Sequence, residues 1–164
     1  MPGVVPIVVM GVSGCGKSTV GKALADRLEV PYAEADDFHP PANVSKMHGG
    51  AALTDDDRRP WLAAIAGRIG TAGQHGLVVS CSALKRVYRD VLRGGDPAAF
   101  FVHLVLTEPV ATARVSGRSG HFMPSTLVAS QFAVLEPLGV DENGIGVDAT
   151  LPTDRIVDKV LSRL

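Results

Sequence analysis

Cysteine, aromatic residues and net charge are all scarce in this chain of 164 residues. Its two cysteines, Cys15 and Cys81, are too few for a disulfide scaffold or for a zinc site with four cysteine ligands. A reducing cytoplasm is therefore the expected compartment. The net charge of −1 disfavours a protein that binds nucleic acid through a broad basic surface, and we expect no nucleic-acid partner.

Long apolar runs are also missing. The first apolar run, residues 4–10, is too short to cross a membrane as a helix, and no basic segment precedes it. We therefore expect a strand there, rather than a signal peptide, and no membrane partner. Hydrophobic residues make up 46% of the chain and charged residues 20%, which is typical of a globular protein. The length predicts a single domain over residues 1–164.

Strand-like apolar runs alternate with helix-like amphipathic segments along the chain. Strands are expected at residues 4–10, 31–34, 77–82, 100–106 and 145–148. Helices are expected at residues 19–28, 43–48, 54–69, 83–93, 107–116, 125–135 and 153–164, and the third is expected to be capped by Thr54 or by one of the acids that follow it. This alternation predicts an α/β fold with a largely parallel sheet.

The most specific motif follows the first expected strand. Residues 11–18 read Gly-Val-Ser-Gly-Cys-Gly-Lys-Ser, which matches the phosphate-binding pattern Gly-x-x-x-x-Gly-Lys-Ser/Thr. Glycines let backbone N–H groups approach phosphate oxygens, and the N-terminus of the following helix adds partial positive charge. Lys17 is expected to reach the β- and γ-phosphates, and Ser18 to coordinate Mg²⁺. The expected nucleotide-binding residues in this loop are Gly11, Val12, Ser13, Gly14, Cys15, Gly16, Lys17, Ser18 and Thr19.

Two other segments are expected beside this loop. Glu34 and Asp36 come at the end of the second expected strand, and prolines 40 and 41 end the regular structure after them. Ligands of open α/β sheets bind outside the carboxyl ends of the strands, so both acids are expected at the mouth that holds the phosphate loop. Residues 117–125 are cationic and contain glycine and proline, a composition typical of a mobile lid.

The phosphate loop alone leaves several classes of nucleotide-binding protein open. The Asn-Lys-x-Asp motif of GTPases is absent, and we attribute the Asp-x-x-Gly match at residues 141–144 to chance because no convincing strand precedes it. The chain is also short for a motor or transporter ATPase domain. A small kinase, whose lid keeps water from competing with the acceptor, is the favoured interpretation. A nucleotide-dependent switch without an acceptor is the more distant alternative.

Six sequence blocks, in order, resemble the small gluconate kinases, which are relatives of shikimate kinase. The blocks are residues 11–18, 34–40, 43–47, 53–62, 81–93 and 118–136, within a resemblance that runs from residue 8 to about residue 148. The resemblance implies a three-layer P-loop kinase fold, with a central parallel sheet flanked by helices and a small lid. It also implies transfer of the γ-phosphoryl group of ATP to the 6-hydroxyl of D-gluconate with Mg²⁺, and a homodimer. A kinase for shikimate or another small molecule remains the closer alternative.

The reaction needs a carboxylate near the reacting hydroxyl. We expect Asp36 in this role, because its placement resembles the second acid of the Asp-x-Asp pair in shikimate kinases. Glu34 replaces the first acid of that pair, and the resemblance implies that it orients a water molecule on the metal. The alternative for both residues is a pair of solvated loop acids.

The carboxylate of gluconate requires a cation at the other end of the site. Arg58, Lys85 and Arg89 are the candidates, and the last two are expected one helical turn apart just after a central strand. For Arg58 the alternative is pairing with Asp55 on the same helix face. For Lys85 and Arg89 the alternative is a solvated helix face.

The expected lid and its surroundings contribute the remaining candidates. Arg118 is expected to neutralise charge on the transferring phosphoryl group. Arg114 matches the arginine that lies against adenine or the phosphates in the related kinases, with a surface position as the alternative. His39 and His121 lie beside these segments and are candidate substrate contacts, although lone histidines are commonly structural or solvated.

Overall fold

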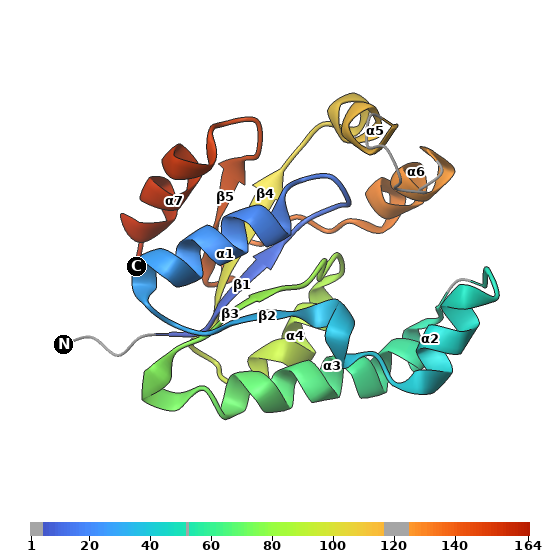
Figure 1. The fold of residues 1–164 in the computed structure, drawn as a ribbon, viewed down its shortest axis with the longest axis horizontal. Coiled ribbons are helices and arrows are strands. Elements are labelled where there is room, and N and C mark those ends of the chain that lie inside the picture. The colour runs from blue at the N-terminus through green and yellow to red at the C-terminus, as the bar shows by residue number, and fades with distance from the viewer. Residues whose placement is uncertain (1–4, 52, 117–124) are drawn as a thin grey trace.

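The computed structural model describes residues 5–51, 53–116 and 125–164. Its centre is a five-stranded sheet in the order β2-β3-β1-β4-β5, and every neighbouring pair of strands is parallel (Figure 1). The strands are β1 (Ile7–Met10), β2 (Tyr32–Glu34), β3 (Val78–Ser80), β4 (Phe100–Val105) and β5 (Gly144–Asp148). The α/β fold with a central parallel sheet is therefore confirmed.

Helices connect these strands in the order that the alternation predicts. The α-helices are α1 (Lys17–Leu28), α2 (Pro41–His48), α3 (Asp55–Gly70), α4 (Arg86–Arg93), α5 (Glu108–Ser116), α6 (Ser125–Val134) and α7 (Thr153–Leu161). Two short 3₁₀ helices, η1 (Ala35–Phe38) and η2 (Gly73–His75), follow β2 and α3 in the chain. Helices α1 and α7 pack on one face of the sheet and α3 and α4 on the other, which gives three layers (Figure 1). In the described parts of the chain, no helix has both the length and the apolar character needed to cross a membrane.

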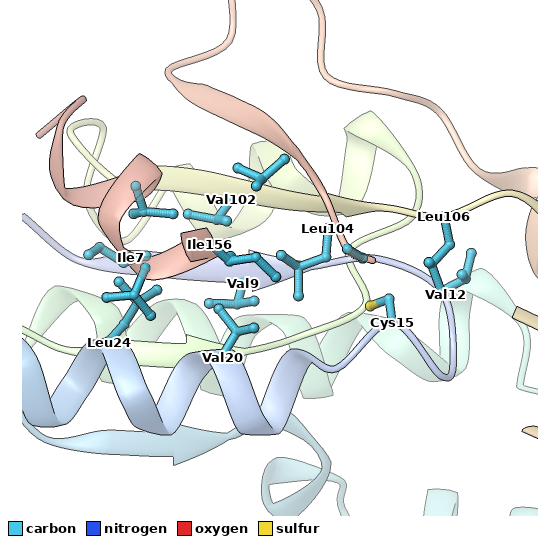
Figure 2. Packing of buried hydrophobic residues seen from close by; sticks show 14 of the residues in the cluster. Ile7, Val9, Val12, Cys15, Val20, Leu24, Val102, Leu104, Leu106 and Ile156 are labelled. Carbon is cyan, nitrogen blue, oxygen red and sulfur yellow. The ribbon is translucent and has the colours of Figure 1, made fainter. Parts of the chain in front are cut away.

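The central strands are buried on both faces, as expected for a parallel sheet between helical layers. Along β1, Ile7 and Val9 belong to the core beneath α1 and α7, whereas Val8 and Met10 belong to the core on the other face. Figure 2 shows the first of these cores, in which Val20 and Leu24 of α1 face β1. A one-residue slip of β1 would exchange the two faces, so packing sets its register.

The same core continues beneath the phosphate loop. Val12 and Cys15 of the loop are only 2% and 1% exposed, and they pack with Leu104 and Leu106 (Figure 2). Packing of these apolar side chains holds the loop against the core, and the loop backbone remains available to contact a ligand.

Two helix starts test the sequence predictions. Of the expected caps of α3, the structure has Thr54: Thr54 Oγ1 accepts a hydrogen bond from the N–H of Asp57 at 3.1 Å, and Asp57 Oδ2 accepts one from the N–H of Thr54 at 2.8 Å. The helix expected from residue 83 was wrong at its start, because α4 begins at Arg86. Ala83 has a positive φ of 45° and Lys85 is extended, so neither residue has helical backbone angles.

Candidate active site

The phosphate loop joins β1 to α1 through three glycines with positive φ. The φ angles are 146° at Gly11, 84° at Gly14 and 91° at Gly16. A Cβ atom at Gly11 would lie 2.8 Å from the Cys15 sulfur and 2.9 Å from the Leu104 carbonyl oxygen. Glycine at position 11 is therefore required by both conformation and space.

The loop holds its lysine close to its own first residues. Lys17 Nζ donates hydrogen bonds to the carbonyl oxygens of Gly11 at 3.1 Å and Val12 at 3.2 Å. At the start of α1, no side chain of the described residues caps the helix, so the N–H groups of its first turn remain available to a ligand. An ammonium group and a free helix N-terminus at one place form a site for a phosphate chain.

A cleft of about 540 Å³ lies beside the loop. Besides the loop, its lining includes Glu34 at the end of β2, Asp36 in η1, Met47 in α2 and Gln131 in α6. The structure therefore brings the expected base and metal-side acid to the same cleft as Lys17. Of the expected lid, residues 117–125, residues 117–124 with Arg118 and His121 lie outside the described residues, and Ser125 is the first residue of α6.

Glu34 is fixed by a hydrogen-bonded network across β2 and β3. The Tyr32 hydroxyl donates to Glu34 Oε1 at 2.6 Å and lies 2.8 Å from Ser80 Oγ. Ser80 Oγ in turn donates to the carbonyl oxygen of Lys17 at 2.9 Å. Burial and the neighbouring Glu34 carboxylate raise the pKa of Tyr32 to about 12, so its hydroxyl keeps the proton that it donates.

Helix α3 fixes the short turn that carries Asp36. The indole N–H of Trp61 donates to the carbonyl oxygen of Ala35 at 2.7 Å. The Trp61 ring also stacks on His39, with ring centroids 4.3 Å apart and planes 10° from parallel. Burial lowers the pKa of His39, and the Arg58 charge adds to this effect while the Asp36 charge opposes it. His39 is therefore a neutral imidazole at pH 7, beside an exposed Asp36 carboxylate.

Arg58 and Lys85, two of the three expected carboxylate-binding cations, meet at one acidic side chain. Lys85 Nζ lies 3.2 Å from Asp55 Oδ2, and Arg58 Nη1 lies 3.6 Å from Asp55 Oδ1. The Tyr88 hydroxyl donates to the same carboxylate and accepts a hydrogen bond from Arg58 at 3.3 Å. The bond from Tyr88 and the bond from Lys85 lower the pKa of Asp55. The sequence predicts the pairing of Arg58 with Asp55 as one alternative, and the structure shows that Lys85 pairs with the same carboxylate.

Arg89, the third cation, requires a correction. Its side chain is 0% exposed, and it pairs with Glu142, whose side chain is 1% exposed. Arg89 Nε and Nη2 lie 2.8 and 3.0 Å from the two carboxylate oxygens, and Nη1 donates to the Ala83 carbonyl at 2.8 Å. A guanidinium with these internal partners has no donor directed at a substrate in the cleft. Arg89 is therefore a structural residue, and its Glu142 partner lies in the segment whose sequence match we attributed to chance.

Two side chains, one from α5 and one from α6, make hydrogen bonds to the phosphate loop. Arg114 donates to the carbonyl oxygens of Gly14 at 3.1 Å and Ala149 at 3.2 Å, so it joins the loop to the end of β5. Gln131 accepts a hydrogen bond from the N–H of Ser13 at 2.8 Å and donates to Ser13 Oγ at 3.1 Å. The sequence analysis did not assign a role to Gln131. The available signal was a polar side chain spaced four residues from each of leucines 127 and 135.

Neither cysteine has the character of a nucleophile. Both side chains are buried, and burial raises the pKa of Cys81 to about 12. Burial also raises the pKa of Cys15, against the opposing effect of the Lys17 charge. Covalent chemistry through a thiolate is therefore not supported at this cleft.

Comparison with known proteins adds a family to this geometry. A model of the shikimate kinase family matches residues 13–120. The gluconokinase of Gluconobacter oxydans is 46% identical over 157 residues, which cover 94% of this chain and 88% of that protein. The thermoresistant gluconokinase of Escherichia coli K12 is 40% identical, over 92% of this chain and 87% of that protein.

Solved structures agree with these relatives. The crystal structure of a gluconokinase from Sinorhizobium meliloti 1021 is 48% identical and superposes with a TM-score of 0.88, covering 97% of this chain and 90% of that one. The shikimate kinase of Aquifex aeolicus superposes with a TM-score of 0.63 at 14% identity, which is a likeness of fold alone.

Proposed function

The chain belongs to the gluconokinase family, within the wider shikimate kinase family, and we propose that it transfers the γ-phosphoryl group of ATP to the 6-hydroxyl of D-gluconate. The products are 6-phospho-D-gluconate and ADP. The observation that carries this proposal is the placement of Asp36 in the same cleft as Lys17 of the phosphate loop. A proton acceptor and a phosphate-binding cation thus face a shared space, as phosphoryl transfer to an alcohol requires.

At the nucleotide end, the loop amides and Lys17 bind the triphosphate. The ammonium group of Lys17 already lies beside Gly11 and Val12, from which it reaches the β- and γ-phosphates when ATP is bound. Arg114 keeps Gly14 in place, and we propose that its guanidinium also borders the nucleotide.

The residues at this end suit Mg²⁺. In the parts of the chain that the structure describes, no three His, Cys, Asp or Glu side chains converge on one point, so a site made entirely of such ligands is not available there. Mg²⁺ is commonly held by one or two protein oxygens together with waters and substrate phosphates. We propose Ser18 as the direct ligand and Glu34, oriented by Tyr32, as the acceptor for a metal-bound water. When bound, the ion would neutralise charge on the β- and γ-phosphate oxygens.

At the acceptor end, Asp36 takes the proton of the 6-hydroxyl. The hydroxyl oxygen forms the new bond to the γ-phosphorus, while the bond from that phosphorus to the bridging oxygen of ADP breaks. Lys85 and Arg58 bind the gluconate carboxylate at the far end, in competition with Asp55, and the neutral His39 offers a contact to a substrate hydroxyl. Arg89 has no part in this assignment because its partners are internal.

Asp36→Asn tests the proposal directly. We expect turnover with gluconate to fall by at least ~10², with ATP affinity nearly unchanged, because the amide cannot accept the proton. Asp37→Asn is the matched control, since Asp37 is the exposed neighbour in the same turn and does not line the cleft. Rates would be measured with a coupled 6-phosphogluconate dehydrogenase assay, and nucleotide affinity by calorimetry. A near-normal rate for Asp36→Asn removes Asp36 from the role of base.

An acceptor panel distinguishes the alternatives. Phosphorylation of shikimate but not gluconate would favour the closer alternative, and slow ATP hydrolysis that no sugar acid changes would favour a nucleotide switch. We also propose a homodimer, by analogy with the family, and light scattering after gel filtration measures the mass that decides it.

A further inference from the structure

Gln131 of α6 makes two hydrogen bonds to the phosphate loop that the reaction as described does not use. Its carbonyl oxygen accepts the N–H of Ser13 at 2.8 Å, and its amide donates to Ser13 Oγ at 3.1 Å. A backbone N–H can only donate, so the Gln131 oxygen must face Ser13 N and the amide orientation is fixed. The contact joins residues 118 positions apart in the chain.

The position of Ser13 shows which end of the triphosphate this contact serves. The amides at the start of α1 cradle the α- and β-phosphates, whereas the P-loop lysine reaches the β- and γ-phosphates. Lys17 Nζ lies at the carbonyl oxygens of Gly11 and Val12, directly before Ser13. The first residues of the loop are therefore at the γ-phosphate end. Gln131 and Asp36 line the same cleft, so Gln131 borders the space in which we propose that transfer occurs.

We propose that Gln131 is a positioning residue for the γ-phosphoryl group: it fixes Ser13 and presents a neutral amide, rather than a charge, to that end of the triphosphate. The proposal rests on ATP as the phosphoryl donor of the proposed function. It predicts that changes at position 131 alter the affinity for a nucleoside triphosphate more than the affinity for a diphosphate. A residue that only stabilised the fold would weaken both affinities equally.

Gln131→Glu keeps the hydrogen bonds to Ser13 but adds a negative charge, so it tests the effect of charge alone. A carboxylate of the same shape still accepts from Ser13 N–H, and the Ser13 hydroxyl can turn to donate to it, so both hydrogen bonds persist. The substitution nevertheless adds a negative charge near the γ-phosphate. We expect about 10- to 30-fold weaker binding of a non-hydrolysable ATP analogue, and less than about 3-fold weaker binding of ADP.

Gln131→Ala removes the contact without adding charge. The loss of two neutral hydrogen bonds predicts about 3- to 10-fold weaker binding of the ATP analogue, with ADP binding nearly unchanged. Ser13→Ala removes only the hydroxyl bond and keeps the backbone bond, so its effect should be smaller than that of Gln131→Ala. Ser130→Ala is the matched control, because Ser130 is exposed and its hydroxyl donates only to Leu127 of its own helix.

Calorimetric titration of the full chain with the ATP analogue and with ADP decides the question without any acceptor. It therefore tests Gln131 even if gluconate proves not to be the substrate. Melting temperatures show whether each variant is folded. If Gln131→Ala does not fold, Ser13→Ala and Gln131→Glu provide the test. The proposal is supported if Gln131→Glu lowers affinity for the ATP analogue at least three times more than affinity for ADP. Equal losses for the two nucleotides, or no loss with Gln131→Glu, overturn it.

Discussion

The buried ion pair between Arg89 and Glu142 yields a sharp stability prediction. Glu142→Gln keeps the shape of the side chain but removes the charge that neutralises a guanidinium with 0% exposure. Removal of one partner from a buried pair costs about 3–5 kcal/mol, because the other charge stays buried without compensation. Arg93 also donates to Glu142 at 2.8 Å, so the substitution weakens two contacts.

The pKa of Glu142 gives the same magnitude by a second route. Burial alone would raise this pKa, but hydrogen bonds from Arg89, the Gly139 N–H and Arg93 outweigh it and lower the pKa from 4.5 to about 2. A shift of this size corresponds to about 3 kcal/mol of stabilisation at neutral pH. For a chain of this length, that loss lowers the melting temperature by about 6–12 °C.

The pH dependence follows from the direction of the shift. Because the folded-state pKa is depressed, the stabilisation is complete well above pH 4.5 and is lost as the pH falls toward 2. The difference in unfolding free energy between wild type and Glu142→Gln should therefore shrink by about 1 kcal/mol from pH 7 to pH 4.

Urea unfolding at both pH values measures this difference. Asp141→Asn is the control, because the Asp141 side chain is 63% exposed in its pair with Arg86 and exposed ion pairs contribute little to stability. The reasoning fails if Glu142→Gln is no less stable than Asp141→Asn, or if the difference is the same at both pH values.

Two further predictions concern Lys85 and the two cysteines. Lys85→Met should raise the KM for gluconate by about 10- to 100-fold and leave the KM for ATP unchanged, since a hydrogen bond to a charged group is lost at the acceptor end only. Arg59→Met, which removes the charge of an exposed arginine in α3, is the control for steady-state kinetics. Cys15 and Cys81 should react with a thiol reagent only at the rate of unfolding, because burial raises both pKa values, and fast labelling of the native protein would contradict this.

Local motifs predicted the phosphate loop and the alternation of strands and helices, because each depends on residues that are neighbours in the chain. The loop needs glycines at fixed spacing between a buried strand and a helix, and Gly11 and Gly14 have the positive φ that such a turn demands. The sequence predicted the start of α3 to within a few residues, because the Thr54 capping box involves residues only three positions apart.

The role of Arg89 could not be derived in this way. Its partner Glu142 lies 53 residues further along the chain, in a segment without regular structure, and only the fold brings the two together. The expected helix from residue 83 made Arg89 seem to share a face with Lys85, but the positive φ of Ala83 delays the helix start to Arg86. An alanine with that backbone angle carries no sequence signal, since glycine is the residue that normally marks it.

The strand order of the sheet sets the distance between the end of the cleft that binds the phosphate donor and the end that binds the acceptor. Lys17 follows β1 and Asp36 follows β2, and β3 lies between these strands, so two strand spacings of about 4.8 Å each separate the two segments. Close polar contacts link the Lys17 carbonyl at the start of α1 to Ser80 of β3, and Ser80 to Tyr32 and Glu34 of β2. Strands β1 and β2 hold the segments with Lys17 and Asp36 in place. The γ-phosphate and the acceptor hydroxyl can therefore meet between these two segments without a large rearrangement of the sheet.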